Sequence, residues 1–99
     1  MRLVKVKSSD GKELTVSLPE KFDFQLHKEF REAYEEEGIS SLVLDMNKTQ
    51  YMDSSALGML LQLKDYGDKN NNKISIKNAS SNVMQIMQIA HFDKLFTVT

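Results

Sequence analysis

Three consecutive polar residues, Asp53, Ser54 and Ser55, are the part of this sequence whose side chains are best suited to chemistry. They lie between an apolar run at residues 40–46 and a long apolar segment that begins at residue 56, which predicts a junction between a strand and a helix. The first backbone N–H groups of a helix have no partner within it and carry the positive end of its dipole. A phosphate group on Ser54 would therefore be tolerated.

Two interpretations of this junction stand side by side. A phosphate on Ser54 would add nearly two negative charges next to Asp53 and change any surface that a partner must cover. Alternatively, Asp53, Ser54 and Ser55 only cap the following helix, as Asp and Ser commonly do. The small residues Ala56 and Gly58 would allow a close approach, yet helix packing explains them equally well.

A hydrolase is the competing chemical hypothesis, because a serine at such a turn resembles a nucleophile elbow. That motif reads Gly-x-Ser-x-Gly, whereas residues 52–56 read Met-Asp-Ser-Ser-Ala and lack both glycines. His27 and His91 are isolated, and the sequence has no cysteine, which disfavours thiolate catalysis and the common zinc sites. We therefore expect neither an enzyme nor a metal or cofactor site.

Length and charge narrow the function further. The 99 residues fit one domain, and the formal charge of −1 comes from scattered basic and acidic groups without a basic stripe for nucleic acid. The first residues alternate charged and apolar side chains, unlike a signal peptide or a membrane span. We expect a single cytoplasmic domain that binds neither nucleic acid nor membrane.

The elements that must position the polar junction follow from periodicity. Residues 3–7 and 13–18 alternate as strands around the Asp10-Gly11 turn, so an antiparallel hairpin opens the chain. A helix begins at Phe24, with Asp23 as its cap and Gly38 at its end. The apolar run at residues 40–46 is typical of a central strand covered on both faces.

The second half of the chain continues the alternation of helices and strands. A deeply packed helix is expected over residues 56–66, closed by Gly67, followed by a strand at 73–77. Ser80 or Ser81 caps a third helix, and residues 94–98 form a last strand. The order β-β-α-β-α-β-α-β predicts an α/β fold, a mixed sheet with an opening antiparallel hairpin and helices packed against it.

The stretch from Tyr51 to Leu61, which reads Asp-Ser-Ser-Ala-Leu-Gly at residues 53–58, resembles the phosphorylation segment of the STAS family, whose typical pattern is Asp-Ser-Ser/Thr-Gly-Leu-Gly. The order of elements is similar over nearly the whole chain, and Phe22-Asp23 falls where the family often has an apolar residue and Asp. The resemblance implies that Ser54 is the phosphorylated serine and Ser55 a supporting neighbour. It also implies a partner-binding surface formed by Asp23, Asp53, Ser55, Ala56, Leu57 and Gly58.

This resemblance implies a bacterial anti-anti-sigma factor that does no chemistry itself. An anti-sigma factor with a histidine-kinase-like ATP fold would bind the unmodified protein and release a sigma factor. The same kinase, which supplies ATP, magnesium and the catalytic base, would phosphorylate Ser54, and a metal-dependent serine phosphatase would reverse the modification. Asp53 would orient the hydroxyl or contact the partner.

Three departures from the family pattern qualify this expectation. Ala56 stands where many members have Gly and would narrow the space for a docking kinase loop. Residues 19–22 lack a common Gly, and the sequence ends after the last expected strand, without the C-terminal helix of many members. These features are similar to a compact subgroup of Gram-negative signalling pathways in which the modifying regulator carries a receiver domain. The alternative function is a constitutive adaptor, or a subunit of a larger signalling assembly, without phosphorylation.

Overall fold

The computed structural model describes residues 3–99, without the side chain of Asp93. Its strands are β1 (Val4–Lys7), β2 (Glu13–Ser17), β3 (Lys21–Phe22), β4 (Ser41–Asp45), β5 (Tyr51–Met52), β6 (Lys73–Lys77) and β7 (Thr97–Val98). Its helices are α1 (His27–Tyr34), α2 (Ser54–Asn70) and α3 (Ser81–Ile89), with 3₁₀ turns η1 (Phe24–Leu26) and η2 (Phe92–Lys94). The α/β order predicted from the sequence is confirmed, with β3 and β5 as two additional short strands.

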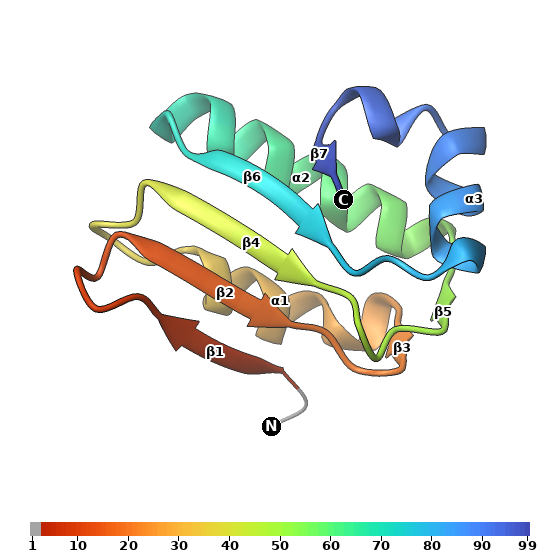
Figure 1. Ribbon diagram of the computed structural model, residues 1–99, viewed down its shortest axis with the longest axis horizontal. Helices are drawn as coiled ribbons and strands as arrows, with labels where there is room; N and C mark the ends of the chain where they lie inside the picture. Colours follow the sequence, from red (N-terminus) through yellow and green to blue (C-terminus); the bar gives the residue numbers. More distant parts are fainter. Residues whose placement is uncertain (1–2) are drawn as a thin grey trace.

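Five strands form a mixed sheet in the order β1-β2-β4-β6-β7, and β4 lies at its centre as predicted. β1 pairs antiparallel with β2, and the other neighbours are parallel. From β2 to β7 each crossover moves to the next strand in the same direction. Because such crossovers are right-handed, their helices fall on one face of the sheet, and α1 and α2 lie behind it in Figure 1.

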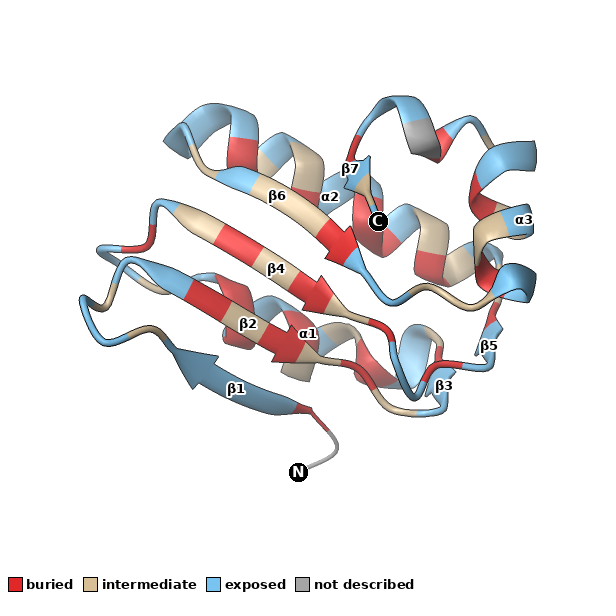
Figure 2. Ribbon diagram, in the orientation of Figure 1, coloured by how far each residue is buried: buried red, intermediate tan, exposed pale blue. Residues whose placement is uncertain are grey.

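The expectation that the central strand is covered on both faces is therefore wrong. Leu42 and Leu44 point to the helices and are buried, whereas Ser41, Val43 and Asp45 are half-buried on the opposite face. Figure 2 shows this alternation along β4. Alternate residues of the apolar run therefore face the helices, and the residues between them face the opposite side and are partly polar. The composition of so short a run does not reveal that only one of its faces is covered.

The core lies between the sheet and the helices. Leu14, Val16, Leu44, Leu60, Leu63, Ile76 and Met87 are each 0% exposed. The second helix is longer than predicted, since α2 begins at Ser54 and continues past Gly67 to a left-handed cap at Asn71. Gly67 lies inside the helix, and a β-carbon there would be 2.5 Å from Ile74 Cδ1, so the missing side chain leaves room for Ile74 of β6 beside α2.

Two other predicted boundaries differ in the structure. The first helix ends at Tyr34, and Gly38 lies beyond it in a turn with φ of +85°. The last strand is shorter than residues 94–98, because η2 extends through Lys94 and only Thr97 and Val98 pair with β6. Ser80, rather than Ser81, caps α3 by accepting a hydrogen bond from the Val83 N–H at 3.2 Å.

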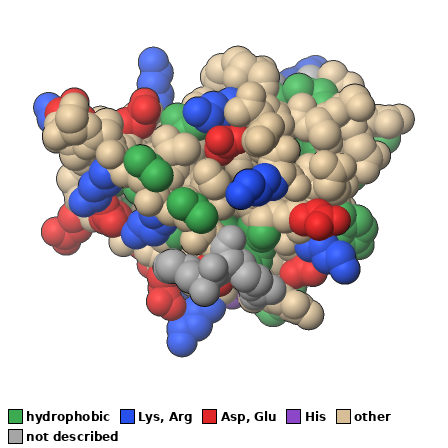
Figure 3. Space-filling view, turned by 60° about the horizontal axis from the view of Figure 1, so that its bottom comes forward, with side chains coloured by type: hydrophobic (Ala, Val, Ile, Leu, Met, Phe, Trp, Pro, Cys, Tyr) green, Lys and Arg blue, Asp and Glu red, His purple; other side chains and the backbone are tan. Residues whose placement is uncertain are grey.

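Among residues 3–99, no helix combines the length and the apolar character that crossing a membrane requires. Figure 3 shows basic and acidic side chains interspersed over the face on which β1 comes forward.

Candidate functional site

The two-stranded sheet of β3 and β5 brings the predicted site residues together. The strands are parallel, with Lys21 opposite Tyr51 and Phe22 opposite Met52. The next residue on each strand is an aspartate, Asp23 after β3 and Asp53 after β5. Because paired parallel strands end at the same edge, both carboxylates lie at one end of this small sheet. Figure 1 shows β3 and β5 beside the start of α2.

Each aspartate also begins a helix. The Asp23 carboxylate accepts a hydrogen bond from the Gln25 N–H at 3.0 Å and caps η1. The Asp53 carboxylate accepts one from the Ala56 N–H at 3.0 Å and caps α2. Asp53 has an extended backbone, φ −109° and ψ −176°, as an N-cap residue requires. The capping interpretation of the aspartates is thus confirmed, and it leaves the neighbouring serine available for another role.

The two serines at the junction differ in what their hydroxyls do. Ser55 is half-buried, and its hydroxyl donates to Asp53 Oδ1 at 2.5 Å. Ser54 is exposed as the first residue of α2, and its hydroxyl has no hydrogen-bond partner among the described residues. A reagent or an enzyme that approaches α2 along its axis therefore meets the hydroxyl of Ser54 free, whereas that of Ser55 is already engaged.

The hydrogen bonds to the Asp53 carboxylate determine how the stability of the fold changes with pH. The Ser55 hydroxyl, and after it the Ala56 N–H, stabilise the carboxylate and lower the pKa of Asp53 from its ordinary value of 3.8. Since the pKa in the folded state is the lower one, Asp53 contributes stability above the ordinary pKa. That contribution disappears as the pH falls through the lowered pKa.

We predict that the Asp53→Asn variant, which keeps a capping side chain but does not titrate, loses less stability on acidification than the unmodified protein. Urea unfolding between about pH 6 and about pH 2 measures both. Asp10 and Glu36 also have lowered pKa values, but they titrate in both proteins and cancel in the difference. Identical pH profiles would contradict a stabilising role of the Asp53 carboxylate.

The other predicted residues divide between core and surface. Ala56 is 0% exposed, and its methyl group packs in the core. Because this methyl group is buried, the expectation that Ala56 narrows the docking space is wrong. The contribution of Ala56 to the site is its backbone N–H, which donates a hydrogen bond to Asp53. Leu57 is half-buried against the core. Gly58 is exposed, and a β-carbon there would have no atom within 4 Å.

Two aromatic side chains beside the aspartates were not predicted as site residues. Phe24 is 63% exposed and Tyr51 is 50% exposed. The Phe24 ring stacks on the ring of His27, with centroids 4.8 Å apart and planes inclined by 18°. In the sequence, Phe24 fits the apolar stripe of a helix, but the 3₁₀ turn that begins the first helix directs it outward. Its position directly after a capping aspartate was the available signal.

A groove between α1 and α2 continues from the Ser54 surface. Gly58 and Leu61 follow Ser54 on one side of α2, at helical spacings of four and seven residues, and Leu61 is 49% exposed. The groove has a volume of about 450 Å³. It is lined by Arg31, Tyr34, Glu35, Leu61, Gln62, Asp65, Tyr66 and Lys69.

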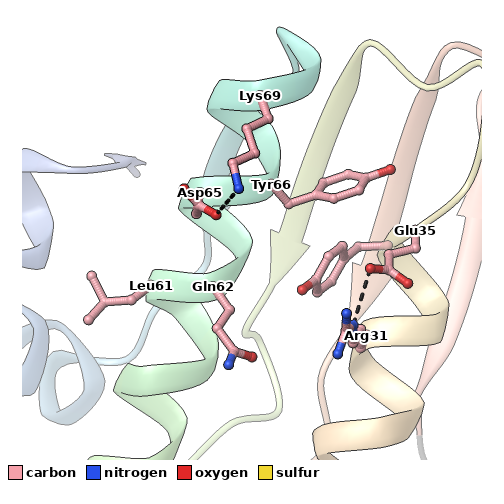
Figure 4. A pocket seen from close by; sticks show the side chains of 8 residues that line it. Arg31, Glu35, Leu61, Gln62, Asp65, Tyr66 and Lys69 are labelled. Carbon is pink, nitrogen blue, oxygen red and sulfur yellow. Dashed lines mark hydrogen bonds and ion pairs between the residues drawn. The ribbon is translucent and has the colours of Figure 1, made fainter.

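The charges at the rims of this groove are compensated within each helix. In Figure 4 Arg31 of α1 pairs with Glu35, the C-cap residue of that helix, and Lys69 pairs with Asp65 on α2. The N–O distances are 3.2 Å and 3.1 Å. The groove therefore offers polar and aromatic contacts but no excess of one charge for a small anion or cation.

The serine–histidine contact that a hydrolase uses is not seen among the described residues. Within residues 3–99, neither His27 nor His91 is hydrogen-bonded to Ser54; His27 stacks on Phe24, and His91 lies in a left-handed turn after α3. The described residues contain no cluster of three or more His, Cys, Asp or Glu side chains that could hold a metal ion.

A family model and a curated relative both match this chain over nearly its whole length. The STAS domain model matches residues 4–99. STAS-domain containing protein PA14_20770 from Pseudomonas aeruginosa (strain UCBPP-PA14) is 42% identical over 101 residues, which span 100% of both proteins.

Solved structures repeat the same fold at low sequence identity. The anti-sigma factor antagonist SpoIIAA in its unphosphorylated form superposes with a TM-score of 0.79 at 14% identity, over 98% of this chain and 87% of that one. Phosphorylated SpoIIAA, described as a Bacillus cell fate determinant, gives 0.71 at 13% identity, over 98% and 90% of the two chains. A sulfate transporter family protein from Wolinella succinogenes gives 0.75 at 13% identity, over 89% and 78%. With the family model covering nearly every residue and a full-length relative at 42% identity, the chain belongs to the STAS domain family.

Proposed function

We propose that this protein is a cytoplasmic regulator of the anti-sigma factor antagonist type, whose binding to an anti-sigma factor or a related serine-kinase partner is switched by phosphorylation of Ser54. The protein itself performs no catalysis in this role. It presents a surface to the partner and an acceptor hydroxyl to the kinase, and a serine phosphatase returns it to the unmodified state. Through the partner, the switch would control transcription.

The difference between Ser54 and Ser55 carries this proposal. Ser55 is held by Asp53, whereas Ser54 is exposed at the start of a 17-residue helix with a free hydroxyl in the described part of the chain. A kinase must take the hydroxyl proton and place the oxygen in line with a phosphoryl group, which only an accessible, unengaged hydroxyl allows. The fold shared with SpoIIAA, solved in phosphorylated and unphosphorylated forms, supports the same assignment.

The chemical step is phosphoryl transfer from ATP bound to the partner kinase. A bond forms between Ser54 Oγ and the terminal phosphorus, the bond from that phosphorus to the bridging oxygen breaks, and ADP leaves. The hydroxyl proton goes to the base of the kinase. The product places nearly two additional negative charges next to Asp53 and at the edge that Asp23 shares.

Modification can block a partner here without refolding the domain. The positive end of the α2 dipole stabilises a phosphate at its first residue, so the fold tolerates the group. The exposed Phe24 and Tyr51 beside it offer the apolar contact area typical of binding surfaces. A partner that buries these rings would also have to desolvate the phosphate, which costs far more than covering a hydroxyl.

The test is intact-mass and peptide mass spectrometry of the protein isolated from its native host, together with a pull-down from the same lysate. We expect a phosphorylated peptide containing Ser54, and a kinase or anti-sigma factor retained by the unmodified protein alone. A permanently unmodified Ser54 with an unchanged set of partners would instead indicate a constitutive adaptor and would overturn the switch.

Gly58 provides a prediction that separates stability from binding. Because it lies inside α2 with open space around its Cα, the Gly58→Ala variant should be more stable by about 0.5–1 kcal/mol. The added methyl group lies one turn beyond Ser54, so we expect weaker binding of the partner. Thermal unfolding and calorimetric titration measure the two effects. Unchanged affinity in the more stable variant would exclude Gly58 from the partner surface.

A further inference from the structure

The five-stranded sheet has one face that none of the described helices covers. α1 and α2 pack on the face that carries Leu14, Leu44 and Ile76, and α3 lies beyond the ends of the strands, against η2 and β5. The residues between these inward-facing ones point to the other side. Figure 1 shows this open face toward the viewer, in front of α1 and α2.

The strand register gives the arrangement of side chains on the open face. Its middle row crosses all five strands and is uncharged: Val6, Thr15, Val43, Ser75 and Thr97. A second row, at the start of the parallel strands, is Glu13, Ser41 and Lys73. A third row, at their ends, is Val4, Ser17, Asp45 and Lys77.

The edge strand β1 places two exposed apolar side chains on this face. Val4 is 55% exposed and Val6 is 59% exposed, whereas the alternate residues Lys5 and Lys7 turn to the helix side and pair with Glu36. The edge strand thus directs its lysines inward and its valines outward. Figure 3 shows hydrophobic side chains between charged ones on the side where β1 comes forward.

We propose that the open face binds a second copy of this chain, sheet against sheet, about a two-fold axis that runs along β4. Rotation about that axis places β2 of one copy on β6 of the other, and β1 on β7. Glu13 then faces Lys73 of the second copy, twice by symmetry, and Val43 meets its own copy on the axis. Such a surface is self-complementary, as a two-fold dimer requires.

The charges select this axis over the other in-plane two-fold. An axis along the rows, perpendicular to the strands, would place Lys73 against Lys77 of the second copy and Ser41 against Asp45. The axis along β4 brings Asp45 near its own copy, but each Asp45 carboxylate is already held within its chain. Its Oδ1 accepts from the Asn47 N–H at 3.0 Å and the Asn78 amide at 3.1 Å, and Lys77 lies beside it in the register.

The size of the face predicts weak association. The face spans five strands about 4.8 Å apart, with at most five residues per strand at about 3.3 Å each, so its flat area is at most about 400 Å² per copy. A stable interface buries about 800 Å² of accessible surface per partner. The dimer therefore forms at high protein concentration, and it leaves the Ser54 edge, on the β3–β5 sheet, outside the contact.

Sedimentation velocity over about 10 μM to 1 mM protein tests the proposal with charge reversals at exposed positions. We expect a mass that rises with concentration toward twice 11.4 kDa. Glu13→Lys or Lys73→Glu alone should raise the dissociation constant at least about tenfold, because each places like charges in contact. The double reversal should restore it, since opposite charges face each other again.

Circular dichroism melts show whether each variant is folded, and Ser54→Asp serves as a matched control that should not change the association. A monomer at every concentration would overturn the proposal. So would self-association that is insensitive to all three charge variants, because that outcome indicates another surface, such as the edge of β1.

Discussion

Replacing Ser54 with aspartate is expected to weaken binding of the anti-sigma partner by at least about tenfold, which corresponds to about 1.4 kcal/mol. The new carboxylate joins Asp53 and Asp23 at the edge where β3 and β5 end, so the partner must cover three neighbouring negative charges. Aspartate is favourable in the first turn of a helix, so the folded state should be as stable as before. Calorimetric titration of the purified partner measures the loss.

Two control variants make this result interpretable. Ser54→Ala removes the acceptor without adding charge, so it should bind the partner within about threefold of the unmodified protein and resist phosphorylation. Ser55→Ala removes the hydroxyl that Asp53 holds, and the protein should still be phosphorylated. Equal binding by Ser54→Asp and Ser54→Ala, or loss of phosphorylation in Ser55→Ala alone, would contradict the assignment of Ser54.

Replacing Phe22 with alanine is expected to reduce the free energy of unfolding by about 3–5 kcal/mol, the usual cost of emptying a buried phenylalanine site. Phe22 is 0% exposed, and its ring meets Phe30 edge-on with centroids 5.1 Å apart. A domain of this size is stabilised by about 5–15 kcal/mol in total, so the variant loses a large share. Because the sequence has no tryptophan, urea unfolding followed by circular dichroism measures the change in the free energy of unfolding.

Phe24 is a matched control for Phe22, two positions away and 63% exposed. Phe24→Ala should change stability by no more than about 0.5 kcal/mol. It should nevertheless weaken partner binding if the aromatic edge is part of the interface. Similar destabilisation by both variants would show that Phe24 belongs to the core rather than to the surface.

The sequence by itself determined most of the regular elements and the polar junction. Alternation in residues 73–77 predicted β6 with its observed bounds, and the Asp10-Gly11 turn predicted the opening hairpin. Both signals are local, since they depend on side-chain period and on the φ of +73° that Gly11 adopts. The capping residues Asp23 and Asp53 were likewise readable, because a cap is a hydrogen bond between near neighbours.

Local signals failed where long-range packing decides. The end of the second helix was placed at Gly67, a residue that usually interrupts helices, but α2 continues through it, and its missing β-carbon leaves room for the Ile74 side chain. The strands β3 and β5 have two residues each and form only because they pair with one another, although 30 positions of sequence separate the paired residues. No window of residues contains that information.

The tertiary structure alone decided which serine is free and what surrounds it. Ser54 and Ser55 are adjacent and chemically identical, and their roles separate only when the helix turns one hydroxyl back to Asp53 and leaves the other in solvent. Pairing of β3 with β5 then brings Asp23 to the same edge. The direction of every crossover left one face of the sheet open, because helices that follow right-handed connections in a single direction can cover only one side.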